Sequence, residues 1–317
     1  MADDPAERLA FPFLDKAGPA ERGLVRVCVT VALGAAAGLL AALSAATLLH
    51  LIAAGLWSAT TGAGFLASIN LLTEADRPDR SLLSYTYELA MVGGASISAA
   101  GAFIAVAARR AGRPMRTFLT VAPRFRWRQA LAGLLIFLPV VAAEIWLDGV
   151  VHPPTDPAPV ATPGASVGDR LIYVAAAAGF LWLAALAEEV LFRGWLLQQA
   201  RAFTRSVAVI VAINAVAFSL AHGDPSVGGL VTRLALGIGW AWIVLRLDGV
   251  EFAAGAHLAN NLGLALLAKP VLLTQSAPQP FEPLSVALQV GTVAALAWGV
   301  EWWVRRGSAA QVLAYRG

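Results

Sequence analysis

The sequence predicts an all-α fold: a polytopic integral membrane helical bundle of about eight transmembrane helices. Composition is the first observation behind this expectation, because 58% of the 317 residues are hydrophobic and only 14% are charged, whereas soluble domains carry roughly 25% charged residues. The second observation is spacing, because apolar runs near the ~20 residues that cross a bilayer recur from Leu24 almost to the C-terminus. We therefore expect one membrane domain, residues 24–304, and no second globular unit.

The first three helices are expected between two polar tails. A proline-punctuated tail covers residues 1–23, and the first helix begins at Leu24 and runs to Trp57. That run is too long for the core of a cleavable signal peptide. The second expected helix, Tyr85–Ala108, is rich in Gly and Ala, which suits close helix contact. A third is expected over Ala130–Trp146, and a short tail, 305–317, follows the last helix.

Five further apolar runs complete the expected bundle. They are Leu171–Gln198, Ser206–His222, Val227–Leu245, Phe252–Ala268 and Leu284–Val304. The second and fourth of these five are short for a membrane span. The single cysteine, Cys28, lies in the first apolar run of the chain, so an intramolecular disulfide and a thiolate metal cluster are excluded.

Arginines between the apolar runs indicate the orientation of the bundle. The loop between the second and third helices contains no acidic residue and seven arginines: Arg109, Arg110, Arg113, Arg116, Arg124, Arg126 and Arg128. Because cytoplasmic loops carry an excess of Lys and Arg, this loop and both chain termini are expected in the cytoplasm. The same distribution argues against a nucleic-acid-binding surface, since these basic residues sit between membrane helices.

Three ionisable side chains lie inside the fourth apolar run: Glu188, Glu189 and Arg193. A charge at membrane depth costs about 2.5 to 3.5 kcal/mol on insertion scales, so such residues are usually functional. Glu189 and Arg193 stand four apart with Glu first, which favours an ion pair on one helix face, and we interpret this pair as structural. Glu188 is left without a local partner and could accept a proton from water near neutral pH.

Two of the four histidines lie in apolar surroundings on later helices. His222 ends the fifth run, and His257 lies in the seventh run, four residues before Asn261. This spacing places an imidazole and a carboxamide on one helical face, where the two could donate hydrogen bonds to a developing oxyanion. Asn260 follows His257 by three residues and could compete for this role, since spacing alone does not separate the two asparagines.

These motifs resemble those of a known family. The stretches Glu188-Glu189-x-x-x-Arg193, Phe218-x-x-x-His222 and His257-x-x-x-Asn261 are similar, in order and interval, to the three motifs of the CAAX-protease and bacteriocin-processing (CPBP) family of intramembrane proteases. The resemblance covers roughly residues 171–268. It implies an eight-helix domain with the site inside the membrane, and substrates cleaved near a membrane segment or a C-terminus.

The resemblance also implies a role for each motif residue. Glu188 would be the general base that activates water, His222 would orient that water, and His257 with Asn261 would stabilise the oxyanion. Glu189 and Arg193 would hold the helix in register. At 1.5 Å per residue, the depths of Glu188, His222 and His257 differ by roughly 16 Å at the extremes. A tilt, a re-entrant entry or a broken helix must therefore bring them together.

We expect an intramembrane endopeptidase that hydrolyses peptide bonds of membrane-associated protein or peptide substrates, embedded in the lipid bilayer of a bacterial inner membrane. No cofactor is favoured, because a metal-free glutamate mechanism assigns each residue one role. The alternative is a zinc-dependent intramembrane metalloprotease with Glu188, His222 and His257 as ligands. A non-catalytic membrane scaffold or immunity protein is a further alternative. A transporter is disfavoured because the sequence shows no inverted repeat.

Overall fold

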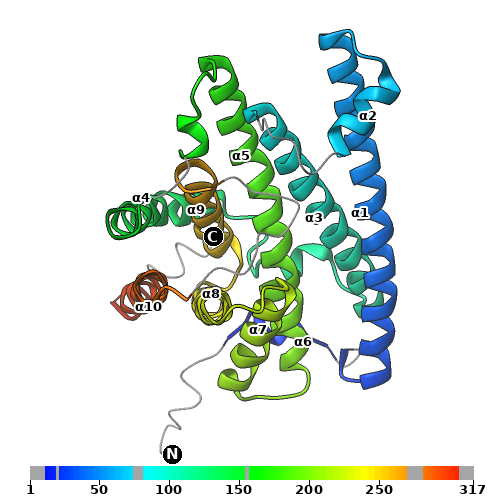
Figure 1. The fold of residues 1–317 in the computed structure, drawn as a ribbon. Coiled ribbons are helices and arrows are strands. Elements are labelled where there is room, and N and C mark those ends of the chain that lie inside the picture. The colour runs from blue at the N-terminus through cyan, green and yellow to red at the C-terminus, as the bar shows by residue number, and fades with distance from the viewer. Residues whose placement is uncertain (1–10, 19–20, 74–80, 154–156, 270–280, 307–317) are drawn as a thin grey trace, which may run out of the picture.

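The protein is a bundle of helices (Figure 1). The computed structural model describes residues 11–18, 21–73, 81–153, 157–269 and 281–306. Its helices are α1 (Leu24–Thr61), α2 (Phe65–Thr73), α3 (Leu82–Ala111), α4 (Trp127–Val151), α5 (Val167–Glu188), the π-helix η6 (Glu189–Leu196), α6 (Leu197–Arg201), α7 (Val207–Ala221), α8 (Val227–Leu247), α9 (Glu251–Leu267) and α10 (Pro283–Arg306). Three short 3-10 turns are η2 (Leu14–Lys16), η4 (Met115–Phe118) and η5 (Pro159–Ala161).

Six of these helices are long and apolar enough to cross a membrane: α1, α3, α4, the continuous helix from α5 to α6, α8 and α10. The shorter helices α7 and α9 have 15 and 17 residues. These eight helices correspond one to one to the eight apolar runs of the sequence, so the expected polytopic helical membrane bundle is confirmed. Their ends differ from the expected ones by a few residues, and α2 was not expected. The C-terminal tail beyond Arg306 lies outside the described residues.

Side-chain caps explain where several helices begin. Ser166 accepts the backbone N–H of Asp169, and the Asp169 side chain accepts the backbone N–H of Ser166, which is a capping box at the start of α5. Ser206 and Ser226 cap α7 and α8 in the same way with one bond each. The α3 helix ends at Gly112, whose φ of 68° is the left-handed conformation of a helix C-cap.

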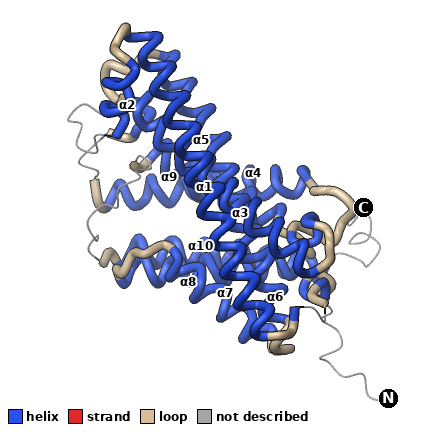
Figure 2. The backbone as a smooth tube through the Cα atoms, turned by 90° about the vertical axis from the view of Figure 1, so that its right-hand side faces the viewer, coloured by secondary structure: helices blue, strands red, loops and turns tan. Residues whose placement is uncertain are grey.

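Two sets of helices cross at a steep angle. Figure 1 looks nearly along α4, α8 and α10, while α1, α3 and α5 are seen from the side. Figure 2, turned by 90°, shows α4, α8 and α10 from the side. Helix α9 packs against both α4 and α5, and α8 packs against α7 and α10. This crossing supplies the tilt that the differing motif depths required. A helix that crosses α5 steeply meets it at a single point along its length, so residues at different positions in their own helices can reach the same depth.

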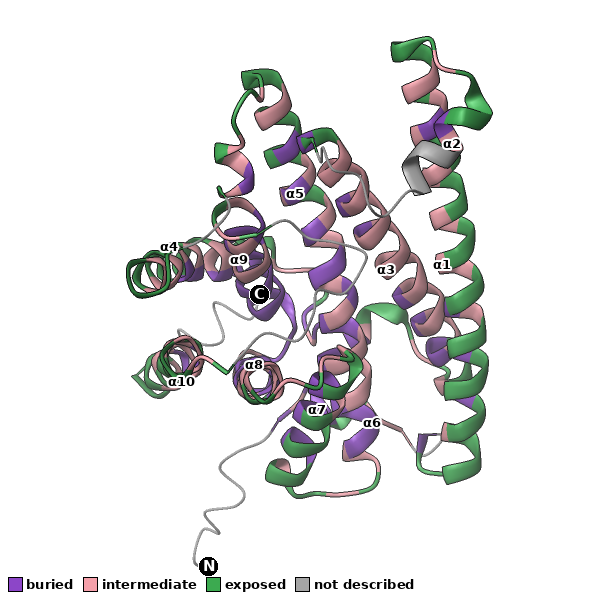
Figure 3. Ribbon diagram, in the orientation of Figure 1, coloured by how far each residue is buried: buried purple, intermediate pink, exposed green. Residues whose placement is uncertain are grey.

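Helix α9 has more buried residues than any other helix in the described part of the chain. Twelve of its residues are buried, and Figure 3 shows the purple of buried residues along much of its length. Its contact with α4 depends on small residues, since a Cβ at Gly255 would collide with the carbonyl oxygen of Ala130 and a Cβ at Gly133 with that of Phe252. Such close backbone approach is the usual role of glycine between membrane helices. It fixes the position of α9 against α4.

A buried ion pair ties the start of α9 to the start of α4. The Arg126 guanidinium donates from Nε and Nη2 to the two Glu251 carboxylate oxygens at 2.9 and 2.7 Å, and Nη1 donates to the carbonyl oxygen of Leu247 at 2.9 Å. The Glu251 side chain is fully buried. A bidentate arginine fixes direction as well as distance, so the register of α9 is set at its first turn.

From Phe11 onward the N-terminal segment packs into the core of the bundle, although a polar tail was expected there. Phe11, Phe13 and Leu14 are buried in the same core cluster as Trp240 of α8, and the rings of Phe11 and Trp242 meet edge to face at 6.3 Å. The sequence pattern did not predict this docking, because three apolar residues among prolines and charges carry no helical or strand period. The part before Phe11 lies outside the described residues.

Candidate active site

The two adjacent glutamates lie at a change of helix type. Glu188 is the last residue of α5, and Glu189 is the first residue of the π-helix η6. The wider π turn is supported from α7, where Asn214 Nδ2 donates to the carbonyl oxygen of Phe192 at 2.6 Å. That oxygen also accepts the backbone N–H of Leu197, five residues on. Stretches of π-helix are rare and are found mostly at functional sites.

The ion pair expected between Glu189 and Arg193 is present and buried. Arg193 Nη1 lies 3.1 Å from Glu189 Oε1, and neither side chain is exposed to solvent. Arg193 also lies over the ring of Phe218, with 4.0 Å from the guanidinium carbon to the ring centroid, and Nη2 donates to the carbonyl oxygen of Leu236 at 3.4 Å. The guanidinium therefore joins η6 to α7 and α8, which compensates for the cost of burying its charge.

Glu189 has a second partner that sequence reasoning missed. His257 Nδ1 lies 2.9 Å from Glu189 Oε1. Because an ionised carboxylate only accepts hydrogen bonds, this geometry requires the His257 proton on Nδ1 and turns Nε2 toward Glu188. The distance from His257 Nε2 to Glu188 Oε2 is 3.8 Å. Glu189 thus orients a candidate catalytic histidine while it pairs with Arg193.

His222 is oriented in the same manner by a backbone carbonyl. It follows the last residue of α7, and its Nδ1 donates to the carbonyl oxygen of Phe218 at 2.8 Å. Its Nε2 lies 3.8 Å from Glu188 Oε2. The Phe218 ring packs edge to face against the His222 ring, with 4.7 Å between centroids. The short length of α7 matters here, because it ends the helix where His222 can reach α5.

Glu188 Oε2 lies between the two imidazoles. It is 3.8 Å from the Nε2 atom of each, and within the described part of the chain it makes no hydrogen bond. The side chains of Glu188 and His222 are 31% and 30% exposed, against 7% for His257. Polar atoms separated by more than 3.5 Å are commonly bridged by water. The site can therefore place one water or substrate oxygen against a carboxylate and two imidazoles, open on the His222 side.

The two asparagines of α9 differ in surroundings. Asn260 lines a separate cavity of about 90 Å³ between α9, α4 and α10, together with Glu144, Asp148 and Ser285. Asn261 stands one helical turn after His257, and its Oδ1 accepts a hydrogen bond from Asn260 Nδ2 at 3.3 Å. The structure brings Glu188, Glu189, His222 and His257 together, and it places Asn261 on the same face of α9 as His257, one turn further along.

The aromatic ring of Phe218 is a further site residue. It touches Arg193, His222 and Phe192 and lies 6.2 Å from the His257 ring. Its spacing of four residues before His222 is visible in the sequence, but any apolar helix offers such pairs. A ring packed against two histidines and a buried arginine excludes water from the Glu189–Arg193 ion pair. It also restricts the rotamers that these three neighbouring side chains can adopt.

The loop after His222 is held by a second ion pair. Asp224 Oδ2 lies 2.9 Å from Arg233 Nη1 of α8. The backbone N–H of Ser226 and the Arg233 guanidinium lower the pKa of Asp224 to about 2. Asp224 therefore stays ionised at every pH at which the protein would be assayed, and the chain on the exposed side of His222 keeps its anchor.

The residues fit a bound metal ion incompletely. Tetrahedral zinc, with ligand distances of about 2.0 to 2.1 Å, places its ligand atoms roughly 3.3 Å apart, about half an ångström closer than Glu188 and the histidines lie. Across the residues that the structure describes, no group of three His, Cys, Asp or Glu side chains meets the geometry for holding a metal. The Nδ1 hydrogen bonds of both histidines, however, are the kind that orient metal ligands.

Comparison with known proteins points to one family. A model of the type II CAAX prenyl endopeptidase Rce1-like family matches residues 170–263, the stretch from the start of α5 to most of α9 that contains all the candidate residues. This match confirms the resemblance drawn from the three motifs. The chain is also 29% identical over 161 residues to the "Uncharacterized protein YyaK" of Bacillus subtilis (strain 168). The aligned part is 49% of this chain and 52% of that protein, so the chain spans about half the length of this curated relative. No solved structure matches the chain.

Proposed function

We propose that this chain, whose residues 170–263 match the model of the type II CAAX prenyl endopeptidase Rce1-like family, is an intramembrane endopeptidase that hydrolyses peptide bonds of membrane-associated proteins or peptides. One observation carries the proposal. A carboxylate oxygen without a hydrogen-bond partner in the described chain lies between the Nε2 atoms of two oriented histidines, inside a helical membrane bundle. Packing alone does not require such an arrangement, since unpartnered buried polar atoms are unfavourable.

Glu188 is the general base in this proposal. Its carboxylate removes a proton from water while the water oxygen attacks the carbonyl carbon of the scissile peptide bond. The tetrahedral intermediate carries the negative charge on the former carbonyl oxygen. When the carbon–nitrogen bond breaks, the proton held by Glu188 passes to the leaving amine, and the carboxylate is restored. Protons and electrons balance without a cofactor.

The two histidines take different roles because their surroundings differ. His222, with Nδ1–H donated to the Phe218 carbonyl, presents the Nε2 lone pair and can hold the second hydrogen of the attacking water. His257 has carboxylates at both ring nitrogens, Glu189 at Nδ1 and Glu188 at Nε2. In this position the His257 ring, held by Glu189 at Nδ1, directs Nε2 toward the reacting atoms, where an Nε2–H would donate to the oxyanion. Asn261, one turn further along α9, supplies the second donor.

Glu189 and Arg193 are positioning residues. Both side chains are fully buried, so neither reaches substrate. Glu189 fixes the ring of His257 through Nδ1. Arg193 neutralises the Glu189 carboxylate, and the Arg193 guanidinium is itself held over the ring of Phe218. The pair thus sets the direction of the imidazole that receives the oxyanion.

Orientation and compartment complete the proposal. The seven arginines from the last turn of α3 to the first turn of α4 favour placement of that end of the two helices and of both termini in the cytoplasm, and the bacterial relative favours a bacterial inner membrane. The protein or peptide substrate would enter from the bilayer, because lipid surrounds the membrane helices that enclose the site.

A zinc-dependent intramembrane metalloprotease is the second candidate, on the same residues. The observation that favours it is the orientation of His222 and His257, whose Nδ1 atoms are held by a carbonyl and a carboxylate as in metal-bound histidines. Glu188, His222 and His257 would hold the ion, which would supply an activated water. The 3.8 Å separations argue against it.

One experiment tests both candidates. The purified protein, reconstituted in lipid, is incubated with membrane-proteome peptides, and products are identified by mass spectrometry. We expect cleavage by the parent protein and a loss of about two or more orders of magnitude in Glu188→Gln, whose amide keeps the size but cannot take a proton. Glu282→Gln, a half-exposed carboxylate that contacts His152 and is far from the site in sequence, is the matched control and should cleave normally. Cleavage by Glu188→Gln at the parent rate would refute the glutamate mechanism. The absence of any cleavage by the parent protein would refute it as well.

A chelator arm separates the glutamate and zinc mechanisms. We expect activity to survive exhaustive treatment with a strong chelator and the active protein to contain far less than one zinc per chain. Stoichiometric zinc that is lost together with activity, and restores activity when added back, would establish the metalloprotease instead.

A further inference from the structure

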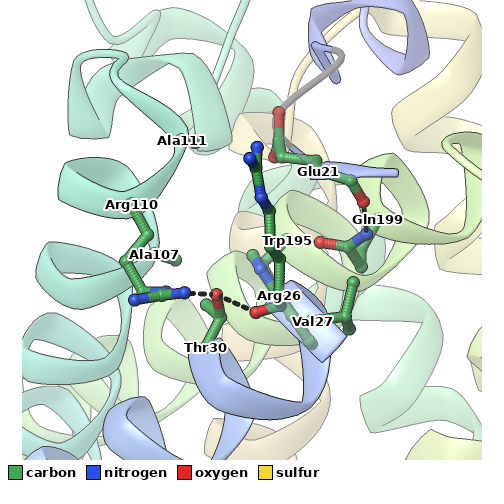
Figure 4. Close-up of a pocket in the computed structure, with 9 residues that line it drawn as sticks. All are labelled: Glu21, Arg26, Val27, Thr30, Ala107, Arg110, Ala111, Trp195 and Gln199. Atoms are coloured by element: carbon green, nitrogen blue, oxygen red, sulfur yellow. Dashed lines mark hydrogen bonds between the residues drawn. The ribbon is translucent and has the colours of Figure 1, made fainter. Parts of the chain in front are cut away.

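A small basic cleft lies at the end of the bundle where α1 begins and α3 ends. Figure 4 shows its lining. The side chains come from three helices and the segment before α1: Glu21, Arg26, Val27, Thr30, Ala107, Arg110, Ala111, Trp195 and Gln199. The space that a water-sized group can occupy is about 20 Å³, enough for one or two oxygen atoms and too small for a hydrocarbon chain.

Arg110 is held so that its outer nitrogens point away from protein acceptors. Its Nε donates to Thr30 Oγ1 at 2.8 Å, and Thr30 Oγ1 in turn donates to the carbonyl oxygen of Arg26 at 2.8 Å (Figure 4). Within the described residues, no hydrogen bond or ion pair is made by the two terminal nitrogens of Arg110. An arginine fixed through Nε presents a preorganised pair of donors, which suits bidentate contact with a phosphate.

The cleft carries positive charge without a compensating carboxylate. Glu21 is the only acid in its lining, and both Glu21 oxygens are engaged elsewhere: Oε1 with Arg113 at 2.9 Å and Oε2 with the backbone N–H of Gly18 at 2.8 Å. Over the described part of the chain, Arg26 and Arg110 have no ion-pair partner. Two unpaired guanidinium groups at one cleft favour an anionic ligand.

The position of the cleft identifies the kind of anion. Arg110 is in the last turn of the membrane helix α3, and Arg26 is in the first turn of the membrane helix α1. Leu24 and Val25, which directly precede Arg26, are 71% and 76% exposed. Exposed apolar side chains beside arginines mark the boundary between hydrocarbon and headgroups, where basic pockets between helices bind anionic lipids.

We propose that this cleft binds the phosphate of an anionic membrane phospholipid, with Arg26 and Arg110 as the recognition residues and the acyl chains lying along the apolar outer surface of α1. Trp195 and Gln199 also line the cleft, and they belong to the same continuous helix as Glu189 and Arg193. A bound phosphate therefore connects α1 and α3 to the helix that carries the glutamates. This proposal stands whether or not the protein cleaves peptides.

The test uses the purified full-length chain in detergent, titrated with phosphatidylglycerol or with phosphatidylcholine of the same acyl chains. Native mass spectrometry counts bound lipid, and thermal denaturation measures its effect. We expect one tightly held phosphatidylglycerol and a raised melting temperature, with neither effect from phosphatidylcholine. Equal retention of the two lipids would refute recognition of the anionic headgroup.

Charge-matched variants locate the binding. Arg26→Gln with Arg110→Gln should weaken phosphatidylglycerol binding about 25-fold, from about fivefold for each arginine at a membrane surface. Arg124→Gln with Arg128→Gln removes the same charge from two exposed arginines that do not line the cleft, one in the loop before α4 and one in the first turn of α4, and should leave binding unchanged. An equal loss in both double variants would show that binding follows total charge and would refute the site.

Two further arms cover misfolding and the source of the phosphate. Arg110→Lys keeps the charge but loses the fork and the bond to Thr30, so we expect several-fold weaker lipid binding in a protein that melts normally without lipid. Unchanged lipid affinity in Arg110→Lys would contradict the bidentate contact. Inorganic phosphate at millimolar concentration should neither raise the melting temperature nor displace the lipid. Stabilisation by phosphate alone that depends on Arg26 and Arg110 would mean that the ligand is a soluble phosphate.

Discussion

A carboxylate, two imidazoles and a buried ion pair form one continuous set of contacts at the residue scale. Glu189 is its centre, because a single oxygen of this side chain lies 3.1 Å from Arg193 Nη1 and 2.9 Å from His257 Nδ1. The neighbouring Glu188 has its carboxylate oxygen directed at two Nε2 atoms instead. Adjacent residues of identical chemistry therefore have different surroundings: Glu189 orients a histidine, and Glu188 faces two imidazole nitrogens, as the proposed general base would.

Removal of the Glu189 side chain should act on stability. Glu189→Ala leaves Arg193 buried without its carboxylate, and breaking a buried pair typically costs about 3 to 5 kcal/mol. Thermal denaturation in detergent should show a clear drop in melting temperature. Asp15→Ala is the control, because it breaks the exposed pair with Arg201, where the side chains are 54% and 26% exposed, and an exposed pair contributes about 0 to 1 kcal/mol. Equal melting temperatures for the two variants would contradict the importance of the buried pair.

The two asparagines of α9 should separate by activity. Asn261→Ala removes the proposed oxyanion donor and should lower kcat by about 10² to 10³. Asn260→Ala alters the cavity beside Glu144 and should change kcat much less. Steady-state rates on the same cleaved peptide give the comparison, and circular dichroism confirms that both variants are folded. A larger loss in Asn260→Ala than in Asn261→Ala would reverse the assignment.

At the scale of elements, the position of α9 decides the geometry of the site. This helix carries His257 and Asn261, and it is located by the Arg126–Glu251 pair at its start and by the close approach of Gly255 to Ala130 on α4. The π-helix η6 is the second determinant, since it sets the direction of Glu189 relative to Glu188. The position of α9 and the π-turn of η6 both depend on contacts between helices. They set the directions of the site side chains without contributing a reacting group.

An added methyl group at Gly255 should displace α9. The Cβ of Gly255→Ala would meet the backbone of Ala130, which cannot rotate away as a side chain can. Overpacking of this kind costs about 1 to 3 kcal/mol, and the resulting shift would move His257 away from Glu188. We expect a lower melting temperature together with reduced cleavage. Gly179→Ala on α5 has open space around its Cβ and should be neutral or stabilising by up to about 1 kcal/mol. Similar losses in both variants would contradict the close-contact argument.

At the scale of the whole molecule, the asymmetric distribution of arginines predicts topology. Labelling of single cysteines from either side of the membrane, after replacement of the exposed Cys28, tests it. Met115→Cys, in the exposed part of the arginine-rich loop, should react only with reagent on the cytoplasmic side. Ala161→Cys, in the exposed turn η5 before α5, should react only from outside. Labelling with the sides exchanged would overturn the orientation of the bundle and of both termini.

The sequence by itself determined the class of the protein and the identity of its candidate residues. Apolar runs of spanning length require helices, because backbone groups in a bilayer must be paired within the chain, and charges inside such a run stand out by their cost. Spacings of four residues predicted the Glu189–Arg193 pair and the shared face of His257 and Asn261 correctly, since one helix fixes which residues lie together.

Only the tertiary structure decided what crosses from one helix to another. The pairing of Glu189 with His257, the support of η6 by Asn214, the contacts of the Phe218 ring with Arg193 and His257, and the docking of Phe13 and Leu14 all join residues far apart in the chain. Periodicity carries no information on crossing angle or on the rotation of one helix about its axis against another. The steep crossing of α9 and α5 (Figure 1) and the wider turn of η6 supply both, and they bring motifs of unequal depth to one point.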